Sequence, residues 1–277
     1  MNVKSLTTSD NLGGVDVYRS QMVTSRTGRA RRWAPAVCVA LWGVLAAPSA
    51  MAQSTIFNIP STDVVDKAKT YVEFDVLPQA PTPDVGGMIT IYNPRVLFGV
   101  GHDVEVGLNF PIYHYSQGSP SNFAYIQPDV KWKFFKNDDM GLAASAGIVV
   151  NAPLNERDGQ GTWAYYYGNF SKKWKDGPRV TAGIYGVAAD QDSGKATFVG
   201  KKVGALLGYE QPIGGPVSFV ADWFSDKNSL GYFTPGISVA LPHSGLLNIG
   251  YSFGNDSWEN SNATKNRYVF VYYGVTF

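Results

Sequence analysis

The chain has 277 residues, and its 23 lysines and arginines nearly balance its 22 aspartates and glutamates. This balance provides no basic footprint for nucleic acid, and a single cysteine excludes a disulfide framework or a cysteine metal site. Thirty glycines and 14% aromatic residues, without long helical patterns, favour many short, packed strands.

The first element in chain order is a predicted signal peptide. Four arginines within residues 26–32 precede an apolar run over residues 34–47, and small residues follow it up to Ala52. A basic region, a short apolar region and a small-residue cleavage site are typical of secretory signals. The run is shorter than the roughly 20 residues of a spanning helix. We expect residues 1–52 to be a signal peptide with an N-terminal extension, cleaved after Ala52, and the start at Met1 or Met22 stays open.

Cleavage would change the charge of the chain. Residues 1–52 carry 6 basic and 2 acidic residues, so the processed chain has 17 − 20 = −3. The only cysteine, Cys38, would be lost with the signal. Residues 53–68 show no clear period, and we interpret them as a periplasmic N-terminal segment.

Twelve segments with strand-like alternation follow within residues 69–277. Most are long enough for a tilted membrane strand of roughly 9–11 residues. They are expected at residues 69–77, 88–100, 104–115, 123–135, 141–151, 162–174, 179–189, 198–211, 217–225, 232–241, 246–253 and 267–277.

The connections between these segments alternate between short and long. Short periplasmic turns and long external loops are the rule in bacterial outer-membrane barrels, and an even strand number places both chain ends in the periplasm. The predicted fold class is therefore all-β, a transmembrane antiparallel up-and-down barrel of about 12 strands over residues 69–277. A secreted soluble β-domain is the alternative. Pro94, Pro111, Pro128 and Pro235 interrupt strand runs, so the count could lie between 10 and 14.

The alternation also assigns the two faces of the strands. A Lys or Arg that faces lipid near the midplane costs about 2–4 kcal/mol, so the charged sets should face inward. The predicted lumen and selectivity residues are Glu73, Asp75, Arg95, Glu105, Asp129, Lys131, Lys133, Lys173, Arg179, Lys202, Glu210 and Asp222. They could line a water-filled pore, or they could pair across neighbouring strands and narrow the interior. Inward glycines, among them Gly208, Gly236 and Gly250, remove side-chain volume.

A search for catalytic and metal-binding residues favours no enzyme. His102 and His243 lie in predicted turns, and His114 precedes Ser116 near an external rim. No Asn, Gln or acid at strand spacing orients His114, so a lipid-hydrolysing His–Ser pair is disfavoured. Residues 190–194 resemble half of a calcium loop but lack its bidentate glutamate. We expect no metal site and no cofactor.

The last nine residues alternate and end on an aromatic side chain. They resemble the C-terminal strand of Gram-negative outer-membrane β-barrels, which the barrel assembly machinery reads; the resemblance assigns this signal to Phe277, Val275 and Tyr273. The segment Ile56–Asp63 also resembles the N-terminus of transporter-like outer-membrane barrels grouped with phenol-degradation pathway proteins. No ligand-binding residue is carried over from that likeness.

The leading functional hypothesis is an outer-membrane channel for passive passage of small polar or amphipathic solutes. Its expected partners are outer-membrane lipids, the barrel assembly machinery and a small-molecule solute, and its expected location is the outer membrane. A structural or surface-interaction barrel with a closed lumen is one alternative. An outer-membrane lipid hydrolase is the other.

Overall fold

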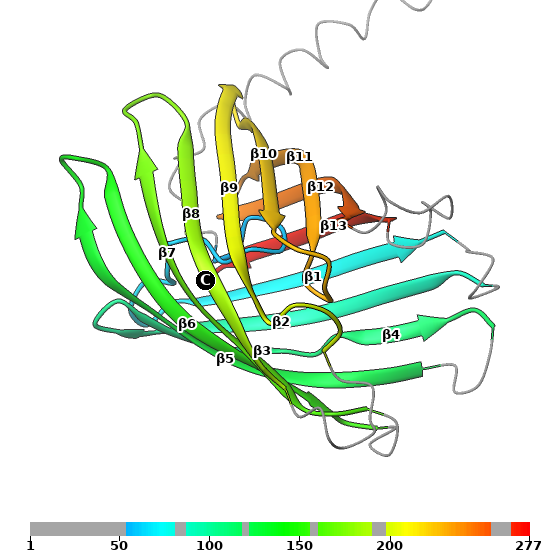
Figure 1. Ribbon diagram of the computed structural model, residues 1–277. Helices are drawn as coiled ribbons and strands as arrows, with labels where there is room; N and C mark the ends of the chain where they lie inside the picture. Colours follow the sequence, from blue (N-terminus) through cyan, green and yellow to red (C-terminus); the bar gives the residue numbers. More distant parts are fainter. Residues whose placement is uncertain (1–53, 81–86, 118–121, 156–159, 190–197, 256–266) are drawn as a thin grey trace, which may run out of the picture. The chain divides into compact units, whose positions relative to one another are not determined.

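The computed structural model describes residues 54–80, 87–117, 122–155, 160–189, 198–255 and 267–277. The predicted signal peptide and the half calcium loop lie outside these residues. Within them, β-strands form one antiparallel sheet (Figure 1). The strands are β1 (Thr70–Gln79), β2 (Ile89–Gly101), β3 (Val104–Asn109), β4 (Ile112–Tyr115), β5 (Asn122–Asn137), β6 (Leu142–Pro153), β7 (Trp163–Lys173), β8 (Arg179–Ala189), β9 (Val203–Gly214), β10 (Val217–Phe224), β11 (Tyr232–Leu241), β12 (Gly245–Gly254) and β13 (Arg267–Thr276).

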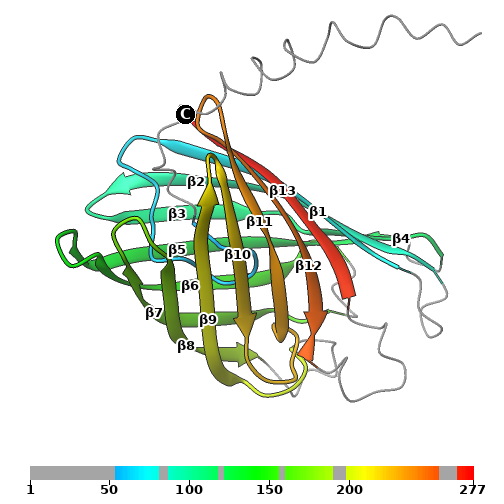
Figure 2. The ribbon, with the colours of Figure 1, turned by 90° about the horizontal axis from the view of Figure 1, so that it is seen from above.

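The sheet closes on itself. β1 pairs with both β2 and β13, so the first and last strands leave no free edge between them (Figure 2). Strands β3 and β4 both pair with β2 and β5, so they are two halves of one interrupted strand. The predicted closed antiparallel barrel of 12 strands is confirmed. No helix in the described ranges is long and apolar enough to cross a membrane.

Proline explains the interrupted strand. β3 ends at Asn109 and β4 begins at Ile112, on either side of Pro111, which has no N–H to donate to a neighbouring strand. The backbone carbonyl of Pro111 still accepts a hydrogen bond from the N–H of Tyr125, at 3.1 Å, so the break stays local.

The barrel has two different ends. Short turns join β2 to β3, β5 to β6, β7 to β8, β9 to β10 and β11 to β12, and we name this the turn end; the opposite end is the loop end. The start of β1 also lies at the turn end, because Thr70 and Phe277 exchange backbone hydrogen bonds of 3.3 and 2.8 Å. His102 and His243 lie in two of these turns with positive φ angles of 54° and 58°.

The sheet has apolar side chains on its outer face and polar side chains on its inner face, the reverse of a water-soluble protein. On the outer face, Ile184 is 70% exposed and Ile249 is 48% exposed. On the inner face, Asn248, Thr234 and Ser145 are fully buried. Single apolar residues are commonly exposed on proteins in water, but an outer wall that is apolar throughout is not. This arrangement is therefore the one expected of a barrel surrounded by hydrocarbon.

The N-terminal segment does not lie where the sequence analysis placed it. Residues 53–68 were expected outside the barrel, yet residues 54–65 lie within it, and Ile56, Ile59 and Ser61 are fully buried there. We name residues 54–65 the plug segment. Its hydrogen bonds and ion pairs join it to β2, β3, β5, β7, β8, β10, β11, β12 and β13.

Candidate functional site

The plug segment begins as a tight loop. The backbone N–H of Ser61 donates to the carbonyl of Ser54 at 2.9 Å, and Ile56 N–H donates to the carbonyl of Ile59 at 3.0 Å. These bonds satisfy part of the loop's own backbone. Its remaining polar groups must be satisfied by the barrel wall, because buried backbone groups are rarely left unpaired.

Asp222, on the inner face of β10, provides the main acceptor for this loop. One carboxylate oxygen, Oδ2, accepts the backbone N–H groups of Phe57, Asn58 and Ile59 at 2.9, 2.5 and 2.8 Å. The other oxygen accepts from the Asn58 side chain at 3.3 Å. Hydrogen bonds to an ionised acceptor are the stronger kind. The interaction therefore holds the tip of the loop against one side of the barrel.

Apolar side chains of the plug fill space left by inward glycines. A Cβ atom on Gly250 would lie 2.7 Å from Cζ of Phe57, and one on Gly208 would collide with Ile56. The ring of Phe57 also packs edge-on against Phe270, with centroids 5.4 Å apart. The glycines do enlarge the interior, as expected from the sequence, but the plug occupies the space that they leave.

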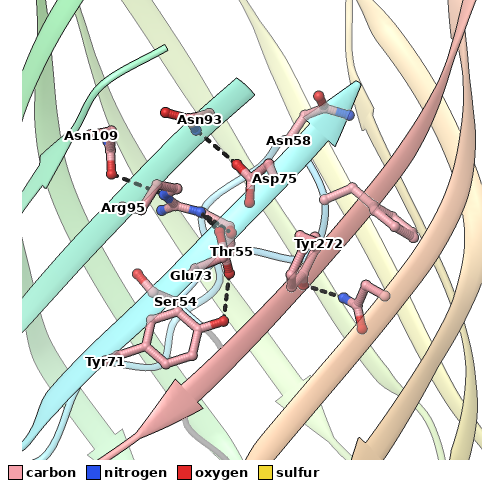
Figure 3. Close-up of polar contacts among 12 residues, drawn as sticks. Ser54, Thr55, Asn58, Tyr71, Glu73, Asp75, Asn93, Arg95, Asn109 and Tyr272 are labelled. Atoms are coloured by element: carbon pink, nitrogen blue, oxygen red, sulfur yellow. Dashed lines mark hydrogen bonds and ion pairs between the residues drawn. The ribbon is translucent and has the colours of Figure 1, made fainter. Parts of the chain in front are cut away.

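Three ion-paired groups tie the remainder of the plug to the wall. Ser54 accepts from Lys131 Nζ at 2.7 Å, and Lys131 pairs with Glu105 at 2.9 Å. On another side, Arg95 pairs with Glu73 and donates to Thr55 Oγ1 at 3.0 Å (Figure 3). These wall charges therefore bind the plug as well as one another.

In the third ion-paired group, one of the carboxylates, Asp63, belongs to the plug itself. Arg179 pairs with Asp63 of the plug and with Glu210 of β9. Burial acts to raise the pKa of Asp63, but the positive charge of Arg179, with Lys133 and Lys131 farther away, outweighs it and holds the pKa below the ordinary value. Asp63 is therefore ionised when the plug is docked.

Ten of the twelve predicted lumen residues lie in strands with buried or half-buried side chains, and the exceptions are Lys173 and Lys202. Eight of them interact with the plug or with its partners: Glu73, Arg95, Glu105, Lys131, Arg179, Glu210 and Asp222 through the contacts already described, and Lys133 through the effect of its charge on Asp63. Asp75 and Asp129 lie nearer the loop end. Lys202 donates to the carbonyl of Ala189 at 2.9 Å, and Lys173 is exposed at the turn end. A role in selectivity stays a prediction for each.

The predicted assembly residues lie on the outer face of the last strand. Tyr273 is 48% exposed and Phe277 is 66% exposed, on the same side as Val275. Their recognition by the assembly machinery stays a prediction.

A cavity lies between the plug segment and the loop end. It has a volume of about 360 Å³, within the roughly 300–1,000 Å³ of small-molecule sites. Ser54, Thr55, Phe57 and Asn58 of the plug form its floor. Nine aromatic side chains are part of its wall, namely Tyr113, Tyr115, Trp163, Tyr165, Tyr167, Phe224, Tyr232, Tyr268 and Phe270.

Polar atoms in this wall are left without a partner. Asp75 accepts from Asn93 Nδ2 at 2.7 Å through Oδ2 (Figure 3), but Asp75 Oδ1 and Asn93 Oδ1 accept no hydrogen bond from the described residues. On the facing side, Asn151 accepts from Gln127, but its Nδ2 donates to none of them. An unpaired buried polar group costs about 1–3 kcal/mol, so a hydrogen-bond partner would stabilise each of these atoms.

The sequence analysis was wrong about the surroundings of His114. Asn122 of β5 lies opposite it, and Asn122 Oδ1 is 2.7 Å from His114 Nδ1. Ser116 Oγ instead accepts the backbone N–H of Met88 at 2.7 Å. The structure therefore supplies an orienting group for His114, on the loop-end rim. Among the described residues, no group of three or more His, Cys, Asp or Glu side chains is placed to hold a metal ion.

Sequence reasoning missed the plug altogether. Its signal was present in the apolar residues Ile56, Phe57 and Ile59, which stand in an otherwise polar stretch just after the predicted cleavage site. Without a strand or helix period, such residues do not indicate where they pack.

A closed barrel with an apolar outer wall, an aromatic C-terminal strand and a filled lumen defines the class: the protein is an outer-membrane β-barrel. No family model and no curated protein matches the chain in sequence. Among solved structures, it resembles the COG4313 outer membrane channel from Pseudomonas putida F1, with a TM-score of 0.50 and 11% identity over 81% of this chain and 99% of that chain. CdiB from Escherichia coli gives a TM-score of 0.37 at 10% identity over 78% of this chain and 64% of that chain. Identities this low show a shared fold only.

Proposed function

We propose that this protein is a passive outer-membrane channel for small polar or amphipathic solutes, and that the plug segment closes it in the state described here. The observation that supports a channel best is the way in which the lumen is filled. A separate segment, in addition to side chains of the wall, fills much of the space through noncovalent contacts. The fold shared with a protein described as a channel agrees with this proposal.

The plug could open the lumen by moving as a unit. If cleavage occurs after Ala52, residues 53–65 form a free chain end that is attached to the barrel only through residues 66–69. Its polar contacts are hydrogen bonds and ion pairs, which water can replace one by one, and its apolar contacts come from Ile56, Phe57 and Ile59. The polar wall behind it would then be hydrated. A permanently closed structural barrel is the competing function.

Conductance of a plug-locked variant separates these two functions. Thr62 Oγ1 and Ser171 Oγ lie 2.6 Å apart, so cysteines at both positions are placed to form a disulfide between plug and wall. We name Thr62→Cys/Ser171→Cys the lock variant. In planar bilayers, the wild type and the reduced lock variant should show channel openings, and the oxidised lock variant should be silent. The single-cysteine variants are the controls. A correctly folded wild type that never conducts would reject the channel.

The pair formed by His114 and Asn122 keeps lipid hydrolysis as a second candidate. Histidine oriented by an amide oxygen is one part of a nucleophilic site, and Ser116 two residues away is the available hydroxyl. Ser116→Ala and His114→Ala should leave phospholipid hydrolysis at background if the protein is only a channel. Hydrolysis by the wild type that both variants lose would establish the enzyme instead.

A further inference from the structure

We propose that the cavity above the plug segment is a binding site for small aromatic cations, such as arylalkyl amines. This inference deepens the proposed channel and rests on it only for the route by which the solute reaches the site. Three features of the cavity support it: the charge of the wall, its unpaired polar atoms and its rings.

The wall has more acids than bases. The acidic and basic side chains of the cavity lining and of their ion-pair partners are Glu73, Asp75, Glu105, Asp129, Arg95 and Lys131. Arg95 pairs with Glu73, and Lys131 pairs with Glu105. Among the described residues, Asp75 and Asp129 form no ion pair within 4 Å; their hydrogen-bond partners are Asn93 at 2.7 Å and Asn109 at 3.2 Å, and the charge of Arg95 acts on both. Two largely buried carboxylates that share one arginine, itself paired with Glu73, favour a further cation beside them.

The unpaired atoms point to the same chemistry. Asp75 is 2% exposed, and its Oδ1 and the neighbouring Asn93 Oδ1 are both hydrogen-bond acceptors without a donor. An ammonium group has donors and no acceptor, so it is the matching partner for either oxygen. An alcohol can donate only one hydrogen bond, and a carboxylate can donate none.

The aromatic side chains of the cavity indicate that the ligand should carry an aromatic ring in addition to its amine. Trp163, Tyr165, Phe224 and Phe270 line the cavity together with the plug's Phe57. Aromatic faces attract cations and also stack on or meet the edge of another ring. A flat ring would pack among these side chains while its amine reaches the acidic side near β1.

Calorimetric titration of the protein in lipid nanodiscs tests the site with three ligands that share a phenyl ring and carry a positive, a neutral or a negative end group. The ligands are 2-phenylethylamine, 2-phenylethanol and phenylacetate, and 2-cyclohexylethylamine replaces the ring. Empty nanodiscs provide the background from partitioning into lipid. The amine should bind the wild type at least about tenfold more tightly than the alcohol, because it adds a charge-assisted hydrogen bond. The cyclohexyl amine should bind more weakly than the aromatic amine.

Variants test whether the carboxylates of Asp75 and Asp129 cause the preference for the amine over the alcohol. Asp75→Asn/Asp129→Asn should bind the amine and the alcohol about equally, and Asp103→Asn, in an exposed turn, should bind like the wild type. If the double variant does not fold, the single Asp129→Asn variant should still reduce the preference. Equal wild-type affinity for amine and alcohol, or no binding of either, would overturn the proposal.

The lock variant separates this inference from the proposed channel. Because the cavity lies on the loop-end side of the plug, the oxidised lock variant should bind the amine with unchanged affinity while it fails to conduct. A conducting protein that does not bind the amine overturns the binding site alone. A protein that binds the amine and never conducts overturns the channel alone.

Discussion

Replacing Asp222 with alanine should release the plug segment while the barrel stays folded. The change removes the acceptor of three backbone N–H groups, from Phe57, Asn58 and Ile59. A hydrogen bond to a charged group contributes about 1.5–3 kcal/mol, but bonds that share one oxygen are not additive, and a released plug can bond to water. We expect a loss of about 3 kcal/mol in docking free energy, which lowers the ratio of docked to undocked plug about a hundredfold.

Hydrogen–deuterium exchange measures this change directly. The amides of residues 57–59 should exchange about a hundredfold faster in Asp222→Ala, since local opening of the plug sets their rate. The amides of β12 and β13 should keep wild-type rates. Asp222→Asn should give an intermediate rate, because it retains one acceptor oxygen and loses the charge. Asp139→Ala, in an exposed turn, is the matched control. Unchanged exchange at residues 57–59 in a folded Asp222→Ala barrel would refute the account of how the plug is held.

Three further predictions concern packing, pH and the outer face. Gly250→Ala, whose Cβ would meet Phe57 at 2.7 Å, should weaken plug docking by about 1–3 kcal/mol, seen as faster plug exchange; a normal plug would contradict the close packing. The pKa of Asp63 is lowered from 3.8, so the carboxylate stabilises the docked plug above about pH 4, and this stabilisation is lost as the pH falls through the lowered value. The fraction of closed channels in bilayers should therefore fall on acidification. Asp63→Asn should remove that pH dependence. Ile249→Lys, on the outer face, should cost about 2–4 kcal/mol in urea unfolding from lipid vesicles, and Ile249→Thr much less; equal costs would argue against a lipid-facing position.

The barrel could be predicted because its signal is local and repeats every two residues. In β12, Leu247, Ile249 and Tyr251 alternate with Asn248 and Ser252, and the structure places the first set outside and the second inside, as expected. The same period assigned the charged lumen residues to the inner face. Of the four prolines expected to interrupt strands, Pro111 separates β3 from β4, but Pro94, Pro128 and Pro235 lie inside β2, β5 and β11, so that expectation was wrong for these three.

The plug and the orientation of His114 could not be predicted, for two different reasons. The plug has no period, and its main partner, Asp222, is more than 160 residues away in the chain, so only the closed barrel brings them together. The contact between His114 and Asn122 joins β4 to β5, and it depends on how these two strands are paired. The sequence between them does not determine that register. Both contacts follow from tertiary pairing, which a search along one strand does not reveal.

The central claim is that lipid surrounds the barrel and that the plug segment fills it. Nuclear Overhauser contacts of isoleucine δ1-methyl groups in lipid nanodiscs test both parts with the native sequence. Ile184, Ile237 and Ile249, all well exposed on the outer face, should show cross-peaks with lipid acyl chains. Ile56 and Ile59 should show none with lipid or water, but should show them with Gly208 of the inner wall. Water cross-peaks at Ile56 and Ile59, or acyl-chain contacts missing from the outer three, would contradict the account.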